Sequence, residues 1–280
     1  MAARAVAVLG AGRMGQALAL ALRDAGWRSR LFARDPRRVP GSPVEISGDI
    51  ATAVAGAAVI LVAVPDDAIA SVAAALRGAT PPMEAVVLHL SGARDRSALA
   101  SLEGWAAGLG SFWPIQAIAA SPGVAGRFAG AFVGLEGDTV ALAAGERLAA
   151  ALGMSAVRIP SEGKALAHAG AVVASNYLVT LLSVAEGLAR ASGVDPSIAD
   201  RIYLPLVRTT LENVASLGTT DALTGPLARG DVGTVRLHLA SLSGPARESY
   251  VALGLTTLAL AERHGLSKEQ AAELRRVLAG

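Results

Sequence analysis

The stretch that decides the fold is residues 5–15, which read Ala-Val-Ala-Val-Leu-Gly-Ala-Gly-Arg-Met-Gly. A short apolar run, typical of a buried strand, leads directly into the spacing Gly10-x-Gly12-x-x-Gly15. In a dinucleotide site Gly10 allows a tight turn, Gly12 lets the backbone approach a pyrophosphate, and Gly15 lets the next helix pack closely on the sheet. This order of strand, glycine turn and helix predicts a nucleotide-binding domain, and the alternative is a glycine-rich turn without a ligand.

The helix after the turn is expected to run from Arg13 to Ala25. Its positive N-terminal dipole and free N–H groups would face the phosphates, so Arg13 and Met14 join the three glycines in the predicted cofactor site. Val64 and Pro65, which end a later apolar run, are assigned to the same site.

Strand-like and helical segments alternate through the first half of the chain. The expected strands are 28–33, 58–64, 85–90, 106–110, 131–135 and 156–159, and the expected helices between them include 67–76 and 138–152. This alternation predicts an α/β, Rossmann-like domain with a mostly parallel, doubly wound sheet over residues 1–159.

After Pro160 no convincing strand follows, and the pattern predicts an all-helical second domain over residues 160–280. The expected helices cover 162–191, 196–217, 232–242, 245–264 and 267–278. Residues 165–185 contain no Asp, Glu, Lys or Arg, and a run of this length is long enough to span a bilayer. Because His168, Ser175 and Asn176 interrupt the run, we favour a fully buried helix at a subunit interface over a membrane span.

The composition excludes several classes of protein. The 280 residues are 52% hydrophobic with a net charge of only +2, and no basic stripe with aromatic residues indicates nucleic-acid binding. The absence of cysteine excludes disulfides and thiolate metal sites, and the scattered histidines predict no metal. The sequence contains neither a G-x-S-x-G nucleophile elbow nor a P-loop lysine, which argues against a hydrolase and against a kinase. No charged-then-apolar leader is visible, so a cytoplasmic location is the default expectation.

The end of the second expected strand indicates which nucleotide is bound. An NAD site carries an acidic residue at this position, but here Arg34 occupies it and Arg37 and Arg38 follow. An arginine can stack on adenine and bind a 2′-phosphate through two hydrogen bonds, so NADP is predicted over NAD. Asp35 is expected to start the turn before Pro36. The alternative is a solvated arginine-rich loop.

Lys164 is one of only two lysines in a chain with 25 lysine and arginine residues, which suggests a need for a compact, titratable ammonium. With Ser161 as the expected N-cap, Lys164 lies in the first turn of a helix, where a bound carboxylate would relieve its conflict with the helix dipole. His168 and Ser175 follow on the same face, and Asn176 lies to one side. We predict Lys164, His168 and Asn176 as catalytic residues and Ser175 as a substrate contact. The alternatives are an exposed lysine and a core histidine.

Ser91 and Gly92 end a strand at the carboxyl edge of the sheet, where ligands bind in such folds. We predict that the Ser91 hydroxyl and the free N–H groups of this turn bind a substrate carboxylate, and the alternative is a simple turn. His89 is expected to face the protein interior, and Asp66 or Asp67 to cap the next helix.

The segment from Thr224 to Asp231 interrupts the helical domain with Gly-Pro, and Asp231 is expected to cap the following helix. Arg229 would then stand on a short ordered loop suited to an anion, so Thr224 and Arg229 are predicted substrate contacts. The alternative is an interhelical turn with a surface arginine.

Two C-terminal stretches, Lys164–Val179 and Ala222–Leu239, resemble the hallmark motifs of a known family. Its members are Rossmann-like, oxidoreductase-like proteins with a C-terminal helical domain of unknown function. They are related to 6-phosphogluconate and β-hydroxyacid dehydrogenases, pyrroline-5-carboxylate reductase and ketopantoate reductase, and the resemblance covers nearly the whole chain.

The resemblance implies a lysine and a histidine or asparagine on the first helix of the helical domain, which Lys164 and His168 match. It also implies a Ser-Gly turn for the substrate carboxylate, matched by Ser91 and Gly92, and an intertwined homodimer. The family often has His-Pro before a Gln, whereas Trp113 stands at the histidine position here, which puts the family's substrate in doubt for this chain.

Three functions follow from these observations. The first is an NADPH-dependent reductase of a small keto acid, similar to ketopantoate reductase, in which Lys164 aided by His168 stabilises or protonates the oxyanion and Asn176 orients the substrate. The second is an imine reductase of the pyrroline-5-carboxylate type, which needs less from Lys164. The third is a non-catalytic protein that binds or senses NADP.

Overall fold

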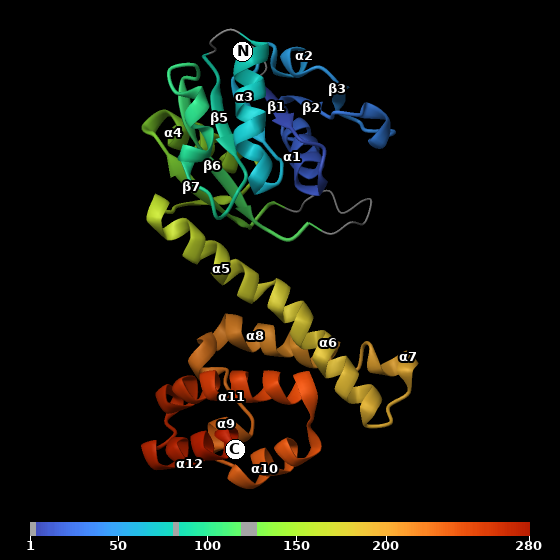
Figure 1. Cartoon of the computed structure of the whole chain (residues 1–280), viewed down its shortest axis with the longest axis vertical. Coiled ribbons are helices and arrows are strands. Elements are labelled where there is room, and N and C mark those ends of the chain that lie inside the picture. Colours follow the sequence, from blue (N-terminus) through green and yellow to red (C-terminus); the bar gives the residue numbers. More distant parts are fainter. Residues whose placement is uncertain (1–3, 81–83, 119–127) are drawn as a thin grey trace. The chain divides into compact units, whose positions relative to one another are not determined.

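The computed structural model describes residues 4–80, 84–118 and 128–280 and divides into two compact units, Met1–Asn176 and Tyr177–Gly280. Every strand of the described ranges lies in the first unit, and the second unit is helical (Figure 1). The predicted fold class, a mostly parallel Rossmann-like sheet followed by a helical region, is therefore confirmed.

The sheet of the first unit has eight strands in the order β3-β2-β1-β4-β5-β6-β7-β8. The strands are β1 Ala5–Leu9, β2 Arg28–Phe32, β3 Glu45–Ser47, β4 Val59–Val62, β5 Val86–His89, β6 Gly108–Ile115, β7 Phe132–Gly137 and β8 Ser155–Arg158. All neighbours pair in parallel except β6 and β7. The strand order reverses direction at β1, which has β2 on one side and β4 on the other, and this switch point opens a crevice at the carboxyl ends of β1 and β4.

Alternate residues of each strand face opposite sides of the sheet, and each side has its own apolar core. Val6 and Val8 of β1 pack with α1 (Arg13–Asp24) and α4 (Thr139–Ala151), while Ala7 and Leu9 pack with α2 (Ile50–Val54), α3 (Ile69–Ala79) and η3 (Arg96–Leu102). The chain therefore buries both faces of the sheet, as a parallel sheet requires.

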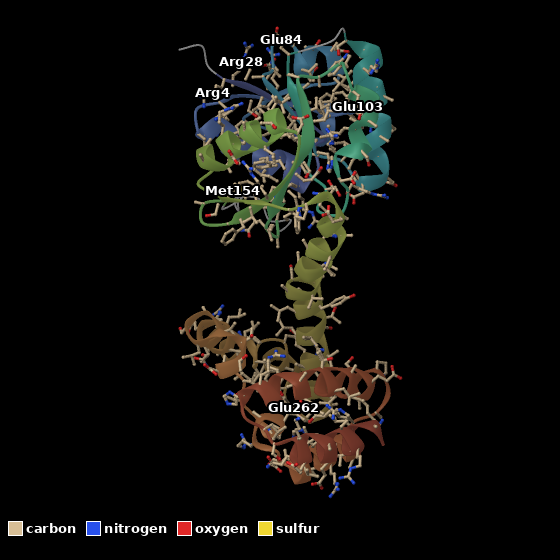
Figure 2. All side chains as sticks on the ribbon, turned by 90° about the vertical axis from the view of Figure 1, so that its left-hand side faces the viewer. Arg4, Arg28, Glu84, Glu103, Met154 and Glu262 are labelled. Atoms are coloured by element: carbon tan, nitrogen blue, oxygen red, sulfur yellow. The ribbon has the colours of Figure 1, made fainter. Side chains whose placement is uncertain are left out.

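The two edges of the sheet differ in chemistry. The exposed charged residues Arg4, Arg28 and Glu84 lie at or just before the starts of strands β1, β2 and β5, so they mark the amino edge, and Figure 2 shows them gathered at one end of the unit. At the carboxyl edge His89, Ser111 and Glu136 are neighbours across β5, β6 and β7. All three are at least nine-tenths buried, so this edge brings polar groups into the interior.

The first unit ends with η4 (Ser161–Gly163) and α5 (Lys164–Ala174). The sequence places a domain boundary between residues 159 and 160, where the last strand ends, whereas the compact units divide after Asn176. The physical reason is that the Lys164 side chain is buried in the first unit, which keeps the start of the helix with the sheet.

The second unit is built around an apolar core between α10 (Val232–Ser241), α11 (Gly244–His264) and α12 (Lys268–Ala279). Its other helices are α6 Asn176–Ala191, α7 Pro196–Ala199, α8 Leu204–Asp221 and α9 Pro226–Arg229. A complete capping box between Ser267 and Gln270 starts α12, and Gly265 in the left-handed region ends α11.

Several local expectations were wrong. β3 was not predicted, β6 extends to Ile115 rather than ending at Gly110, and the single helix expected over 162–191 breaks at Ser175, where φ is −118° and ψ is −68°. The stretch Ser161–Ala191 is nevertheless long and apolar enough to cross a membrane by length and composition, and none of its most apolar window is buried within this chain. The fully buried helix predicted here is therefore not buried by the chain itself.

Candidate functional site

The three glycines of the turn have different surroundings. A Cβ built on Gly10, whose φ is +124°, would lie 2.4 Å from the Ala63 carbonyl oxygen, and one built on Gly15 would lie 2.0 Å from the Gly10 carbonyl oxygen. A Cβ on Gly12 would meet nothing within 4 Å. The first and third glycines are therefore required by the fold, while the second keeps open space beside the backbone.

At the N-terminus of the helix that follows, no side chain competes with a ligand for the free backbone N–H groups. Gly12 is the N-cap of α1, no side chain caps it, and its first turn contains no acidic residue. The free N–H groups and the positive end of the helix dipole suit a phosphate at this point. Arg13 is exposed and Met14 is half-buried against the apolar core, and neither lines the cavity described next.

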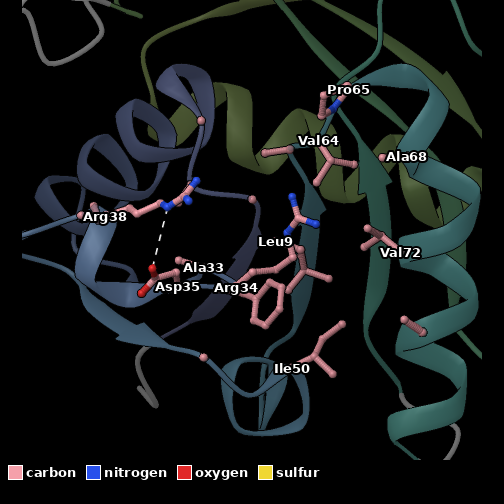
Figure 3. Close-up of a pocket in the computed structure, with 18 of the residues that line it drawn as sticks. Leu9, Ala33, Arg34, Asp35, Arg38, Ile50, Val64, Pro65, Ala68 and Val72 are labelled. Atoms are coloured by element: carbon pink, nitrogen blue, oxygen red, sulfur yellow. Dashed lines mark ion pairs between the residues drawn. The ribbon is translucent and has the colours of Figure 1, made fainter.

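A cavity of about 1040 Å³ opens at the switch point of the sheet. Its walls come from the carboxyl ends of β1, β2 and β4, the start of α2 and the exposed side of α3 (Figure 3). Gly10, Gly12, Arg34, Val64 and Pro65 all line it, so the structure brings together five of the eight predicted cofactor residues around one space. A volume of this size is at the upper end of the usual range for small-molecule sites.

Arg34 and Asp35 differ in how their charges are satisfied. The Arg34 guanidinium extends into the cavity in Figure 3 and forms no hydrogen bond or ion pair with any residue in the described ranges. Asp35 instead caps η1 (Pro36–Arg38), pairs with Arg37 at 2.9 Å and Arg38 at 3.7 Å, and its pKa is lowered chiefly by the Arg37 hydrogen bond. The carboxylate is thus engaged by its own loop, and the unpaired charge facing the cavity is positive.

A second group of polar residues surrounds Lys164 at the carboxyl edge. Only 1% of this lysine is exposed, and its Nζ donates hydrogen bonds to the Ser111 Oγ at 2.8 Å and the Ser91 carbonyl oxygen at 3.2 Å. Burial lowers the Lys164 pKa, and the carboxylates of Glu136, Asp95 and Asp66 oppose that effect. The alternative of a solvated surface lysine is therefore wrong.

The start of α5 also differs from expectation. Ser161 does not cap the helix, whose N-cap is Gly163 without a side-chain hydrogen bond. The Ser161 hydroxyl instead donates to the Glu136 Oε1 at 3.1 Å. This contact fastens η4 to β7 directly before Lys164.

The Ser91–Gly92 turn is held by its neighbours from several sides. The Ser91 Oγ donates to the Asp66 Oδ2 at 2.8 Å and accepts from the N–H groups of Ala93 and Arg94. The hydroxyl that was predicted to bind substrate is thus engaged inside the turn in this chain, and Asp66, expected to cap the next helix, contacts Ser91 rather than capping η2 (Asp66–Ala68). The N–H groups of Ala93 and Arg94 are thus also engaged, and the Gly92 N–H is the one that a substrate carboxylate at this turn could use.

His89 is buried and faces the interior, as the sequence indicates. Its Nδ1 accepts from the Ser91 N–H at 3.2 Å, so the proton of the neutral ring lies on Nε2 and bonds to the Asp95 carbonyl oxygen at 2.9 Å. Burial lowers the pKa of His89 to about 4. The ring is therefore a neutral brace for the turn.

His168 and Trp113 contact the same turn from the other side. A Cβ built on Gly92 would lie 2.5 Å from the Trp113 Cε2 and 2.7 Å from the His168 Cδ2. The two rings meet edge to face with centroids 5.6 Å apart. Lys164 and His168, predicted to share one helix face, thus both reach the Ser91–Gly92 turn, and Gly92 is required because two rings leave no room for a side chain.

Ser175 and Asn176 do not join this group within one chain. An α-helix rises about 1.5 Å per residue, which puts Asn176 roughly 18 Å along the axis from Lys164. A small substrate that touches Lys164 cannot reach an Asn176 of the same chain.

The predicted contacts Thr224 and Arg229 belong to the second unit, and both are exposed. Asp231 caps α10 as expected, accepting from the Thr234 N–H at 3.0 Å and the Thr234 Oγ1 at 2.7 Å. The backbone around Arg229 is fixed by this cap and by Gly230, whose φ is +72°. Arg229 thus stands at the end of α9 on an ordered turn.

Sequence reasoning missed Ser111 and Glu136. Both are buried, both lie beside Lys164, and they pair across β6 and β7. The signal that could have found Glu136 is a carboxylate directly after an apolar, strand-like run. No three histidine or acidic residues in the described ranges lie close enough together to hold a metal ion.

Comparison with known proteins confirms the predicted resemblance. Residues 5–88 match the family described as NADP oxidoreductase, coenzyme F420-dependent, and residues 131–257 match a domain of unknown function, DUF2520. The glycerol-3-phosphate dehydrogenase [NAD(P)+] of Mesorhizobium japonicum is 37% identical over 113 residues, which are 34% of this chain and 33% of that protein. The chain thus spans a third of the length of this curated relative.

Solved structures share the fold over nearly the whole chain. A protein from Bacteroides fragilis, provisionally described as an NADP oxidoreductase, has a TM-score of 0.72 at 22% identity and covers 94% of this chain and 98% of its own. Pyrroline carboxylate reductase of Plasmodium falciparum with NADP bound has a TM-score of 0.63 at 12% identity, covering 98% and 99%. A reductive aminase of Aspergillus terreus in complex with NADPH4, cyclohexanone and allyl amine has a TM-score of 0.59 at 17% identity, covering 100% and 93%. The name of the curated relative includes NAD(P)+, that of the Bacteroides fragilis protein includes NADP, and the other two structures hold NADP or NADPH4, in agreement with the predicted enzyme class and cofactor.

Proposed function

We propose that this chain, which joins an NADP-oxidoreductase type of nucleotide domain to a DUF2520 domain, is an NADPH-dependent reductase of a small keto acid. The observation that carries the proposal is the unpaired Arg34 guanidinium in the cavity that begins at the glycine turn. The open space beside Gly12 fits a pyrophosphate, and Arg34 fits a 2′-phosphate. When bound, NADPH supplies the hydride.

In this proposal the chain's own residues prepare the carbonyl group for reduction. Lys164 places a positive charge at the Ser91–Gly92 turn, where negative charge develops on the substrate oxygen. His168 lies against the same turn and can hold or pass a proton there. The Gly92 N–H of the turn is the proposed partner of the substrate carboxylate, and ketopantoate is the first substrate to try.

A second candidate is the reduction of an imine, and one observation favours it. The Lys164 ammonium is 1% exposed and is already bonded to two acceptors, which limits it as a direct proton donor. A cyclic imine that arrives protonated needs no such donor. Two of the structural neighbours named above, a reductive aminase and a pyrroline carboxylate reductase, carry names that fit this chemistry.

One experiment tests these candidates together. NADPH oxidation is measured against a panel of keto acids and cyclic imines, with the parent and with Lys164→Met, which retains most of the side-chain volume. Keto acid turnover that is lost in the variant supports the first candidate, and imine turnover that survives supports the second. NADPH binding without turnover of any compound would leave the third hypothesis, a non-catalytic NADP-binding protein.

The cofactor part of the proposal has its own test. Arg34→Ala removes charge-assisted hydrogen bonds to the 2′-phosphate, each worth about 1.5–3 kcal/mol, so NADPH binding should weaken roughly 10- to 100-fold while NADH binding changes little. Arg37→Ala is the matched control, because Arg37 pairs with Asp35 on the same loop and does not line the cavity. Equal weakening of NADPH and NADH by Arg34→Ala would contradict the cofactor assignment.

We also propose that the chain works as a homodimer whose interface covers the apolar surface of α5 and α6. Leu166, Val173 and Val179 are 79%, 60% and 67% exposed, and Tyr177 is 56% exposed. A neighbouring subunit fits this surface better than a bilayer does, because α5 begins at Lys164, whose ammonium is bonded inside the first unit. A dimer would also allow an Asn176 from one subunit to lie near a Lys164 from the other. The cytoplasmic location stays a prediction.

A further inference from the structure

We infer that Glu136 is the positioning residue for Lys164: its buried carboxylate keeps the lysine charged and in place beneath the Ser91 turn. The inference rests on the proposed function only in one respect, the role of the Lys164 charge in stabilising the substrate oxygen. The contacts that support it all lie within the first unit and do not depend on a bound coenzyme.

The sheet register brings Glu136 to Lys164. Ser111 on β6 pairs with His89 on β5 and with Glu136 on β7, so the three residues form a row across the sheet. Directly opposed residues of an antiparallel pair point to the same face with Cβ atoms about 4.5–5.5 Å apart. Since the Ser111 Oγ lies 2.8 Å from the Lys164 Nζ, the carboxylate of Glu136 belongs to the immediate surroundings of the ammonium.

Both charged groups are buried without a direct ion pair. Glu136 is 6% exposed and Lys164 is 1% exposed. The partners of the ammonium are neutral, a hydroxyl and a carbonyl oxygen. The Glu136 Oε1 accepts one hydrogen bond from Ser161, and its Oε2 has no partner among the described residues. The hydrogen bonds of the Lys164 ammonium and of the Glu136 carboxylate therefore do not fully offset the cost of burying these charges. The attraction between the two opposite charges supplies the rest.

Other titratable groups face Lys164 but are less suited to this role. Asp95 precedes η3 and is bonded to the N–H and hydroxyl of Ser97, and Asp66 at the start of η2 is engaged with Ser91. His89 on β5 is held in its neutral form. Glu136 is the buried carboxylate of the three, and it opposes the burial-induced lowering of the Lys164 pKa more than the other two carboxylates do.

Glu136 also fixes where Lys164 begins its helix. Its hydrogen bond from Ser161 holds the first residue of η4 on β7, three residues before the lysine. The same carboxylate thus acts on the position of the backbone and on the charge of the side chain. Without it, the ammonium would keep only neutral partners and would lose its proton at lower pH.

The chain permits a direct measurement, because Lys164 and Lys268 are its only lysines. With isotope-labelled lysine, the Cε and Nζ resonances of both residues can be followed through an alkaline pH titration of the full chain. Lys268 starts an exposed turn of α12 and serves as the internal reference. Glu136→Gln removes the buried charge at constant shape, and Glu162→Gln removes an exposed charge from η4 as the matched control.

In Glu136→Gln we expect the Lys164 midpoint to move to lower pH, so that the ratio of charged to neutral lysine at a given pH falls by at least about tenfold. The Lys268 midpoint should not move, and Glu162→Gln should leave both midpoints in place. A Lys164 midpoint that is the same in Glu136→Gln as in the parent would overturn the inference. An equal shift in Glu162→Gln would overturn it as well, since the effect would then not be specific to the buried carboxylate.

If Glu136→Gln does not fold well enough for NMR, unfolding by urea answers the same question. The stabilities of Glu136→Gln, Lys164→Met and the double variant form a cycle that isolates the coupling of the two residues. We expect the double variant to lose clearly less stability than the sum of the two single losses. Strict additivity would overturn the inference.

The outcome is separable from that of the proposed function. A shifted Lys164 midpoint in a chain that turns over no keto acid or imine would leave the role of Glu136 intact and refute the reductase. Lys164-dependent turnover with an unshifted midpoint would refute only the role of Glu136. Where turnover is found, its alkaline limb should move to lower pH in Glu136→Gln.

Discussion

Alanine substitution at Gly12 and at Gly15 should separate ligand binding from folding, although the two positions belong to one motif. Gly12 has φ −69° and ψ 175°, which any residue adopts, and a Cβ there meets nothing within 4 Å. The loss of a favourable N-cap residue costs up to about 1 kcal/mol. The reduced freedom of the unfolded chain returns about 0.4–1 kcal/mol. The free energy of unfolding of Gly12→Ala should therefore stay within about 1 kcal/mol of the parent.

Gly15→Ala should behave in the opposite way. Its Cβ would lie 2.0 Å from the Gly10 carbonyl oxygen and 3.1 Å from the Ala63 Cβ. The first contact is to backbone, so α1 would have to move away from β1. Forcing an extra methyl group into a packed interior costs about 1–3 kcal/mol. With a urea slope of about 1–3 kcal/mol per molar, the unfolding midpoint should fall by roughly 1 M.

For NADPH binding the order of the two variants is the opposite: Gly12→Ala should weaken the binding more than Gly15→Ala. In Gly12→Ala the new methyl group occupies the space through which a pyrophosphate reaches the backbone N–H groups. Loss of hydrogen bonds to a charged group at about 1.5–3 kcal/mol corresponds to roughly 10- to 100-fold weaker binding. Gly15→Ala, where it remains folded, leaves that space open and should bind more tightly than Gly12→Ala.

The chain offers a selective probe for this comparison, because all three tryptophans, Trp27, Trp105 and Trp113, lie in the first unit. Their fluorescence during urea unfolding reports the stability of the nucleotide domain, and calorimetry reports NADPH binding. The reasoning would be refuted if Gly12→Ala lost as much stability as Gly15→Ala. It would equally be refuted if Gly12→Ala bound NADPH with the affinity of the parent.

Two further predictions concern acid stability and assembly. The pKa of His89 falls from 6.5 to about 4 on folding, so the unfolded state binds more protons between these values and the chain should lose about 3 kcal/mol of stability as the pH drops through that window. Urea unfolding at pH 7 and pH 4 tests this, and His89→Gln should show a smaller pH dependence; an unchanged dependence would contradict the assignment. For assembly, light scattering should show a dimer that Leu166→Glu with Val179→Glu converts to monomer, whereas Val140→Glu on α4, also exposed, should not. A monomeric parent would refute the dimer.

The fold could be predicted largely from local patterns, and the failures have local causes. The central strands are continuous apolar runs bounded by turn residues, which indicate buried parallel strands. β3 has three residues, of which Glu45 is exposed, so no apolar pattern marks it. The strand expected over 106–110 stopped at Gly110, five residues before the end of β6. In the structure Gly108 and Gly110 are strand residues, and a Cβ on Gly110 would lie 2.3 Å from the Glu136 carbonyl oxygen.

The site was predictable to the extent that its residues lie close in sequence. Lys164 and His168 are one helical turn apart, so periodicity alone indicated that both would reach one partner. Ser175 was grouped with them because it lies near the same angle, and Asn176 because it lies to one side of that face, but angle ignores the rise along the axis. Ser111 and Glu136 could not be found this way, since their proximity depends on the register of an antiparallel pair that no local pattern defines.

The acceptors around position 164 explain why a lysine rather than an arginine stands there. Almost every other basic residue of the chain is arginine, including Arg34 and Arg38 of the cavity lining, and a planar fork suits a phosphate. At position 164 the acceptors are a hydroxyl and a carbonyl oxygen that approach one nitrogen at 2.8 and 3.2 Å. An arginine fork would need more room and more acceptors than this buried site provides, whereas an ammonium directs its donors independently and can lose its proton. The two basic residues therefore have different roles in the proposed site. Arg34 is exposed and carries a permanent positive charge. Lys164 is buried near the carboxylate of Glu136 and carries a charge that it can lose with its proton.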